Sequence, residues 1–251
     1  MKGLRTVLCL AASLAIGGCA DAVEGGKTAT MNPALCRAAY QSLQSNGGLK
    51  AWQGVSLVRA KAVLTIQEPG AKACVTAVDL TINLSEGVLE ARGQTATGAW
   101  QGRSGINGKS ELSGAGLPGE PALRQQIGTA LATILHRLRG PMNLLLGSDR
   151  AIAGGHDALV DGFDVIRQGA GGGAFDVKAY YFGKADGRLA YLTAGADAPG
   201  GQGTVTVYEY PTGGGLIFPS RLRVIRIGAN VLVGREAADL LLDVTFSDLR
   251  R

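Results

Sequence analysis

The chain has 251 residues, a length that suits a single domain, and its formal net charge of +5 falls to +3 without Lys2 and Arg5. A positive charge this small and this scattered argues against nucleic acid as a partner. Glycine is abundant (39 residues) and aromatic residues are few, which favours many turns between short strands.

The first eighteen residues have the features of a bacterial signal peptide. Lys2 and Arg5 form a basic start, and the apolar run at 6–16 is too short for a bilayer, which takes about 20 residues. The run ends in Ile-Gly-Gly-Cys at 16–19, which resembles the lipobox of bacterial lipoproteins. We therefore expect residues 1–18 to be removed and Cys19 to be lipidated. The alternative is an ordinary secretory signal with a chance cysteine.

The residues after Cys19 bear on localisation. A tri-acylated Cys19 would anchor the protein stably, since two acyl chains suffice for that. In the sorting rule of enteric bacteria, an aspartate directly after the cysteine retains a lipoprotein in the inner membrane. Ala20 takes that place and Asp21 comes one residue later, so we expect the periplasmic face of the outer membrane. Residues 19–31 are predicted to be a flexible tether, and residues 32–251 one folded domain.

Two cysteines remain beyond the lipobox, Cys36 and Cys74. Their spacing matches no zinc pattern and no histidine accompanies them, so in an oxidising periplasm the pair favours a disulfide. The alternative is two buried free thiols.

The first elements predicted after the tether are a helix and several strands. Asn32 as N-cap and Pro33 at the first helical position begin a helix that Asn-Gly-Gly at 46–48 ends. Apolar and polar residues then alternate with the period of a strand, with a turn at 69–70. The predicted strands are residues 58–66, 78–84, 88–95 and 99–103.

A second helix is predicted after the glycine- and proline-rich segment 114–119. Pro121 begins it, and Gly140 and Pro141 end it. Its apolar stripe consists of Leu123, Ile127, Leu131, Ile134, Leu135 and Leu138. His136 lies off this stripe, and we expect it to be solvated.

The rest of the chain is again predicted to be strands, with hairpin turns at 186–187 and 228–230. These strands are residues 157–167, 175–182, 188–193, 204–210, 215–227, 231–233 and 240–246. Arg221, Arg223 and Arg226 alternate along one of them and are expected on its wet face. Strands and helices do not alternate, so a parallel Rossmann-type sheet is not expected.

These elements predict a mainly β (α+β) fold: a curved antiparallel sheet, open as a half-barrel, with two amphipathic helices on its concave face. Two helices are too few to cover so many strands. The uncovered apolar area must face a ligand, a partner, or a tightly curled sheet whose own side chains fill the space. The residues expected to bound an apolar cavity are Val78, Leu80, Ile82, Leu84, Leu123, Ile127, Leu131, Ile134, Leu240, Leu242, Val244 and Phe246.

Four short motifs occur in a defined order along the chain. They are residues 46–52 (NGGLKAW), residues 180–189 (YYF to DGRL), residues 218–222 (FPSRL) and the closing strand that ends in Phe246. Together they resemble the LolA/LolB-like superfamily of periplasmic lipoprotein carriers and receptors. The resemblance implies an open half-barrel with a helical lid, enclosing an apolar cavity for acyl chains.

Catalytic and metal-binding signatures are not evident. His156 with Asp157, Asp161 and Asp164 could supply metal ligands, but a solvated strand face explains the even spacing more simply. Nucleophile-elbow, zinc-protease, Walker and paired-cysteine motifs do not appear. The glycine run at 169–173 precedes no helix that could bind a phosphate. We therefore expect neither an enzyme nor a bound cofactor or metal.

Two functions compete. The first is a binding module, an outer-membrane-anchored periplasmic lipoprotein that holds a lipid, an acyl chain or another lipophile in its half-barrel. The alternative is a non-catalytic assembly or scaffold lipoprotein that docks another envelope protein. An open apolar pocket would favour the first, and a filled concavity with an exposed apolar patch outside would favour the second.

Overall fold

The structure is a computed structural model that describes residues 57–67, 73–140, 151–152, 162–168, 177–195, 203–211, 218–227 and 240–250. These residues form one sheet of twelve strands and one helix, α4, which is Pro121–Leu138. The strands are β1 (Val58–Ile66), β2 (Cys74–Asn83), β3 (Val88–Thr95), β4 (Gly98–Gly105), β5 (Ser110–Ser113), β6 (Ala151–Ile152), β7 (Phe163–Gln168), β8 (Val177–Gly183), β9 (Leu189–Gly195), β10 (Gly203–Glu209), β11 (Arg221–Ile227) and β12 (Leu240–Arg250).

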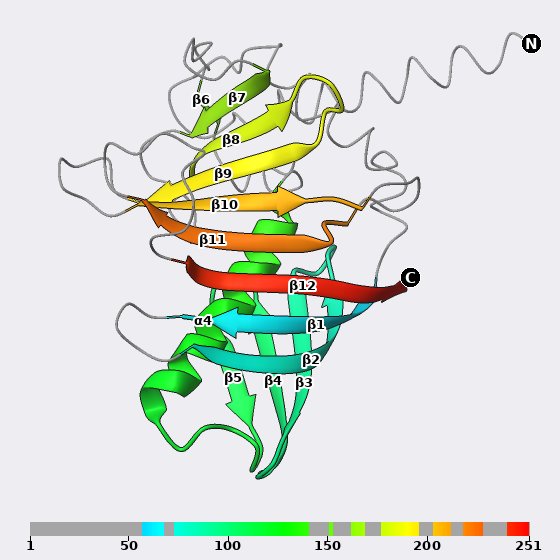
Figure 1. The fold of residues 1–251 in the computed structure, drawn as a ribbon, viewed down its shortest axis with the longest axis vertical. Coiled ribbons are helices and arrows are strands. Elements are labelled where there is room, and N and C mark those ends of the chain that lie inside the picture. The colour runs from blue at the N-terminus through cyan, green and yellow to red at the C-terminus, as the bar shows by residue number, and fades with distance from the viewer. Residues whose placement is uncertain are drawn as a thin grey trace, which may run out of the picture.

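The sheet is antiparallel throughout and open. Its spatial order is β5-β4-β3-β2-β1-β12-β11-β10-β9-β8-β7-β6. The first five strands therefore form an N-terminal wing and the last seven a C-terminal wing. The wings join in the middle, where β1 pairs with β12 and places Ala62 opposite Phe246 and Leu64 opposite Val244. Figure 1 shows the twist of the sheet, with β3–β5 running steeply to β1 and β12 and with α4 crossing behind the strands.

The alternation in the sequence explains the two faces of the N-terminal wing. In β1, residues 58, 60, 62, 64 and 66 are buried while most of the residues between them are exposed. Successive side chains of a strand point to opposite faces, so one face joins the core and the other meets water. The tight turn between β2 and β3 requires a left-handed residue, and Gly87 supplies it with a φ of 66°.

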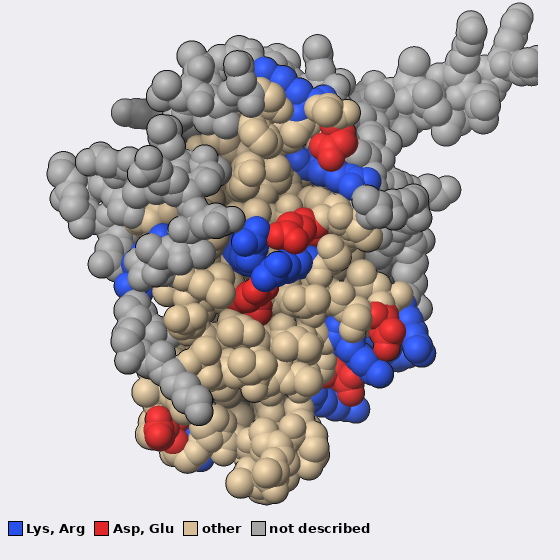
Figure 2. All heavy atoms as spheres, in the orientation of Figure 1, with Lys and Arg blue, Asp and Glu red and all other residues tan. Residues whose placement is uncertain are grey.

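The outer face of the sheet carries charged side chains of both signs. Basic and acidic side chains gather over β10–β12 in the middle of Figure 2. Arg221 donates to both carboxylate oxygens of Asp243, over 2.9 and 2.6 Å, and Arg223 pairs with Glu209 at 2.7 Å. Arg221 and Arg223 thus lie on the outer face, as their alternation predicts.

Helix α4 packs against β1, β3, β4 and β5 on the concave face. It begins at Pro121, where a missing N–H costs nothing, and the preceding Glu120 makes no side-chain cap. Its bounds agree with those predicted from the sequence. Towards its C-terminus it reaches the other wing, where the Tyr208 hydroxyl donates to the Arg137 carbonyl oxygen over 3.0 Å.

The predicted mainly β fold with an open antiparallel sheet is confirmed, and several strand ends differ from prediction. The sequence missed β5, a four-residue Ser-Glu-Leu-Ser strand with one apolar residue, which forms through its pairing with β4. The strand predicted at 157–167 is described only from Phe163 on, and β11 begins at Arg221, after Pro219. The prediction of a solvated His136 is wrong, because its side chain is 6% exposed.

Some predictions fall on residues that the structure does not describe. They include the signal peptide, Cys19, the tether, the first predicted helix and the strand at 231–233. The described residues contain one helix on the concave face, so a cover of two helices stays a prediction.

Candidate functional site

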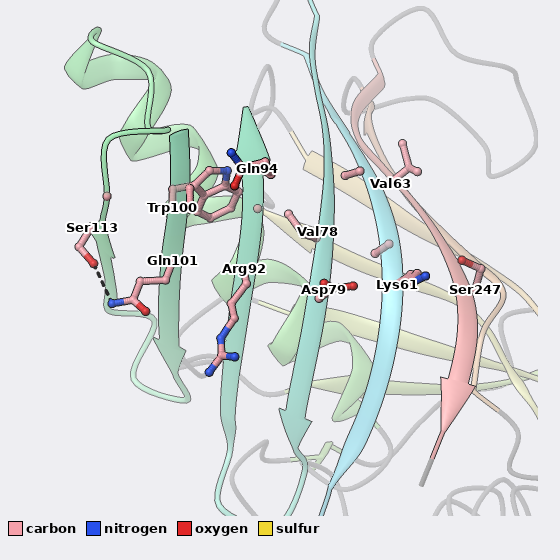
Figure 3. Close-up of a pocket in the computed structure, with 15 residues that line it drawn as sticks. Lys61, Val63, Val78, Asp79, Arg92, Gln94, Trp100, Gln101, Ser113 and Ser247 are labelled. Atoms are coloured by element: carbon pink, nitrogen blue, oxygen red, sulfur yellow. Dashed lines mark hydrogen bonds between the residues drawn. The ribbon is translucent and has the colours of Figure 1, made fainter. Parts of the chain in front are cut away.

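A groove of about 670 Å³ crosses the outer face of the N-terminal wing. A row of paired residues runs across it from strand to strand (Figure 3): Ser247, Lys61, Asp79, Arg92, Gln101 and Ser113. The aliphatic residues Val63, Ala77 and Ala99 line the same groove. Val63 is 46% exposed, and Val75 near it on β2 is 64% exposed. The groove therefore combines a charged row with a small apolar surface.

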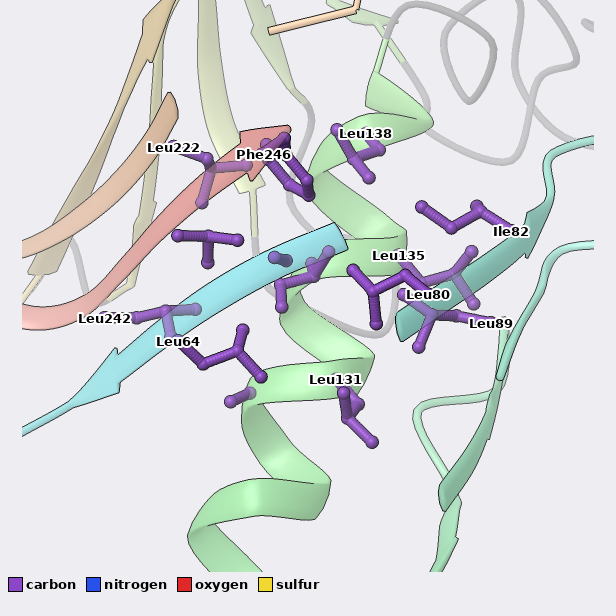
Figure 4. Packing of buried hydrophobic residues seen from close by; sticks show 14 of the residues in the cluster. Leu64, Leu80, Ile82, Leu89, Leu131, Leu135, Leu138, Leu222, Leu242 and Phe246 are labelled. Atoms are coloured by element: carbon purple, nitrogen blue, oxygen red, sulfur yellow. The ribbon is translucent and has the colours of Figure 1, made fainter. Parts of the chain in front are cut away.

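The concave face holds the residues predicted to bound a cavity, and the structure brings them together. Ten of the twelve are buried members of one core cluster, while Leu123 and Leu240 are partly exposed. Figure 4 shows Leu135 of α4 beside Leu80 and Leu89 of the sheet, and Leu131 one turn earlier along the helix. The predicted juxtaposition of the helix stripe with β2 and β12 is therefore present.

In this conformation, side chains fill the space between α4 and the N-terminal wing. Leu131, Leu80 and Leu89 are at most 1% exposed. Leu131 packs so close to the β4 backbone that a Cβ on Gly102 would lie 2.8 Å from its Cδ1. The groove of about 670 Å³ and two smaller hollows beside it are lined by residues of the strands and their loops, with no residue of α4 among them.

The apolar concave surface also continues into the C-terminal wing, where the sequence prediction named only β12. Tyr180 and Phe182 of β8, Leu192 of β9 and Leu222 of β11 are fully buried in the same cluster. Tyr180 and Phe182 alternate along their strand, and this signal could have identified them. The periodicity of a sequence does not indicate the spatial order of strands, so it could not show that β11 lies beside β12.

Hydrogen bonds and apolar packing both attach α4 to the sheet. Ser110 of β5 donates its hydroxyl to the Gly128 carbonyl oxygen over 2.7 Å, and Tyr208 holds the other end of the helix. Apolar packing of Ile127, Leu131 and Leu135 against the strands adds to these hydrogen bonds. Such packing is non-directional, so it tolerates a shift of the helix better than a hydrogen-bond network does.

Three buried basic residues lie at the C-terminal end of α4, His136 and Arg137 in its last turn and Arg139 as its C-cap, and each is at most 6% exposed. Burial and the nearby charges of Arg137 and Arg139 lower the pKa of His136 to about 3, so this imidazole is neutral near pH 7. Burial also lowers the pKa of Arg139, and it raises the pKa of the Tyr208 phenol on β10. The sequence analysis did not single out these residues as a group.

The other predicted site residues are placed only in part. Cys74 lies partly buried at the start of β2 and forms no disulfide with the described residues, and burial raises the pKa of its thiol. Cys36 lies outside the described residues, so the disulfide stays a prediction. Among the described residues, none of the groups of His, Cys, Asp and Glu could hold a metal ion. His156, Asp157 and Asp161 lie outside this part of the chain.

The part of the chain that the structure describes has no helix long and apolar enough to cross a membrane. No protein-family model matches the chain, and no curated protein matches it in sequence.

Two solved structures are similar to this chain in fold. A LolA superfamily protein from Nitrosomonas europaea matches with a TM-score of 0.47 and 8% identity, over 83% of this chain and 93% of that one. A DUF1329 family protein from Desulfovibrio piger matches with a TM-score of 0.34 and 12% identity, over 85% of this chain and 92% of that one.

Proposed function

We propose that this protein is a non-catalytic lipoprotein, anchored through Cys19 to the outer membrane, that binds an acyl chain or another lipophile between α4 and the concave face. The observation that carries the proposal is the apolar concave surface. It runs across both wings from Leu89 to Phe182, and α4 is the one described helix that covers it.

Binding in this place requires α4 to move, because its side chains fill the space in the present conformation. Burying a methylene of an acyl chain is worth about 0.8 kcal/mol, comparable with burying the same group of a leucine. A chain of sufficient length can therefore replace the contacts that the helix gives up. Such a movement would break the hydrogen bond from the Ser110 hydroxyl to the Gly128 carbonyl oxygen, in the N-terminal half of the helix.

A reversible lock on α4 tests the proposal. A Cβ on Gly128 would lie 3.2 Å from the Ser110 Cβ, a few tenths of an ångström short of the usual separation in a disulfide, about 3.5–4.5 Å. The pair Ser110→Cys and Gly128→Cys should therefore form a disulfide that fixes the helix to β5. The full chain carrying Cys19→Ser, which cannot be lipidated, is the background.

The probe is the fluorescent methyl ester of cis-parinaric acid. We expect the oxidised lock to weaken its binding by about tenfold or more, which is about 1.4 kcal/mol, and reduction to restore it. The control is the same background without the lock, whose affinity should not change with reductant. Equal binding in the oxidised and reduced states would place the ligand elsewhere. Failure of the unlocked protein to bind the ester would reject lipophile binding altogether.

A second candidate function is docking of another envelope protein in the groove on the outer face. The observation in its favour is the combination of a filled concavity with exposed Val63 and Val75 beside the groove. Arg92 lies in the middle of the groove, is exposed, and forms no ion pair with the described residues. The partner expected here presents apolar and acidic side chains.

Site-specific photo-cross-linking in intact cells tests the second candidate. A photoreactive residue at Ala77 in the groove is compared with one at Thr81, on the same strand and face but outside the groove. A discrete adduct from Ala77 alone, lost on Arg92→Glu, is the expected result. No adduct, or the same adducts from both positions, would contradict docking in this groove.

A further inference from the structure

The basic cluster, defined as His136, Arg137 and Arg139, lies at the C-terminal end of α4. Arg139 is 4% exposed, and its Nε and Nη1 atoms have no hydrogen-bond partner. Within the described residues, no carboxylate forms an ion pair with it. Burying a charge without a partner is unfavourable, and buried charges in proteins are generally paired.

The fold makes room for this guanidinium group. Gly87, in the turn between β2 and β3, has a φ of 66°, and a Cβ there would lie 2.5 Å from Arg139 Nη1 and 3.0 Å from the Ile106 Cβ. A side chain at position 87 would therefore fill the place that Arg139 occupies. The C-terminal dipole of α4 favours a cation here, but it does not satisfy the unpaired N–H groups.

The basic cluster also lies at the end of the apolar stripe of α4. Leu131, Leu135 and Leu138 follow one another at helical spacing and are buried in the core, and Arg139 is the next residue. Figure 4 shows Leu138 close to the end of the stripe, near Phe246. A chain-like ligand that followed this stripe to its end would bring its terminal group to the basic cluster.

We propose that the basic cluster binds the anionic headgroup, a carboxylate or a phosphate, of the lipophile whose acyl chain lies under α4. This inference rests on the proposed function. Arg139 supplies fixed donors suited to two oxygens of one headgroup, Arg137 adds a second positive charge, and neutral His136 can donate a hydrogen bond or take up a proton.

Headgroup recognition is tested by comparing cis-parinaric acid with its methyl ester, which differ only in the charge of the headgroup. The protein with an unchanged basic cluster should bind the acid about tenfold or more tightly than the ester. Arg139→Gln should abolish this preference while leaving ester affinity unchanged. Arg139→Lys retains the charge and should keep part of the preference for the acid. The matched control is Arg59→Gln, which removes an exposed arginine of β1 and should leave the preference unchanged.

Each outcome separates the headgroup site from the proposed function. If the ester binds but the acid binds no more tightly, the headgroup site is wrong and lipophile binding stands. If Arg139→Gln weakens acid and ester equally, Arg139 has only a structural role. If neither probe binds, the proposed function fails and the headgroup site fails with it.

His136 provides an independent readout, because the chain has only two histidines. An anion bound beside it favours the protonated imidazole, so the acid should raise the pKa of His136 measured by NMR and the ester should not. A further experiment measures the melting temperature with inorganic phosphate alone. If phosphate raises the melting temperature through Arg139 and no acyl probe binds, the site takes a free anion and not a lipid headgroup.

Discussion

His136 follows Leu135 on α4 and lies off the apolar stripe, yet its side chain is almost completely buried. Strand β10 approaches the helix at this point, as the hydrogen bond from Tyr208 to the Arg137 carbonyl oxygen shows. A helical periodicity identifies one buried face, and it cannot reveal that a second part of the sheet reaches the helix from another side.

The buried imidazole predicts a specific acid sensitivity. Its folded pKa of about 3 lies below the ordinary value of 6.5, so between these values the unfolded chain binds more protons. The free energy of unfolding should therefore fall as the pH falls from 6.5 towards 3, by at most about 1.4 kcal/mol per pH unit from this group. Urea unfolding at pH 7, 5 and 4 should show a shallower loss for His136→Gln. Equal pH dependence in both proteins would contradict the assignment.

A second residue-level prediction concerns Gly93 of β3. A Cβ at this position would overlap the indole of Trp100, which is 3% exposed and opposes Gly93 on β4. Gly93→Ala should lower the free energy of unfolding by about 1–3 kcal/mol, because overpacking forces the ring to shift.

Gly119→Ala is the control for this prediction, since no atom lies within 4 Å of a Cβ there. Its effect should stay within about 0.5 kcal/mol in chemical denaturation. Adding Trp100→Phe to Gly93→Ala should recover part of the loss, and simple additivity of the two changes would argue against the contact.

At the scale of elements, the strength of the periodicity decided how well each one could be predicted. Strands β1 and β3 and helix α4 have the bounds predicted from the sequence. Strand β5 has one apolar residue among four and depends on β4 for its hydrogen bonds, so nothing local to its sequence signals it. Its contact with α4 through Ser110 is likewise a tertiary feature.

The predicted disulfide between Cys36 and Cys74 would connect two elements, the first predicted helix and β2. Closing a loop of this length stabilises the folded state by roughly 3–4.5 kcal/mol in the chain-entropy model. Protein extracted from the membrane with detergent should therefore give no thiol labelling after denaturation, and Cys36→Ser should both expose Cys74 to labelling and lower the melting temperature. Labelling of two thiols in the original chain would show free cysteines instead.

At the scale of the whole molecule, the proposed function combines an expected lipid anchor with the open sheet. Cys19 is expected to carry the acyl groups, since the lipobox ends the apolar run of the signal peptide. Intact-mass analysis of detergent-extracted protein should give a chain that begins at Cys19 with an added acylated glyceryl group, and Cys19→Ser should release it from the membrane. An unmodified, freely soluble product of the original sequence would contradict the anchor.

The sequence by itself determined the strand periodicity, the helix at 121–138 and the side of each strand that is buried, because these depend on residues a few positions apart. Only the tertiary structure decided that β1 pairs with β12, because such a pairing joins residues 176 to 191 positions apart and leaves no local pattern. The same holds for the filling of the concave face by Leu131 and for the burial of Arg139 against Gly87. Packing and charge burial are set by which surfaces meet, and this meeting is a property of the folded sheet.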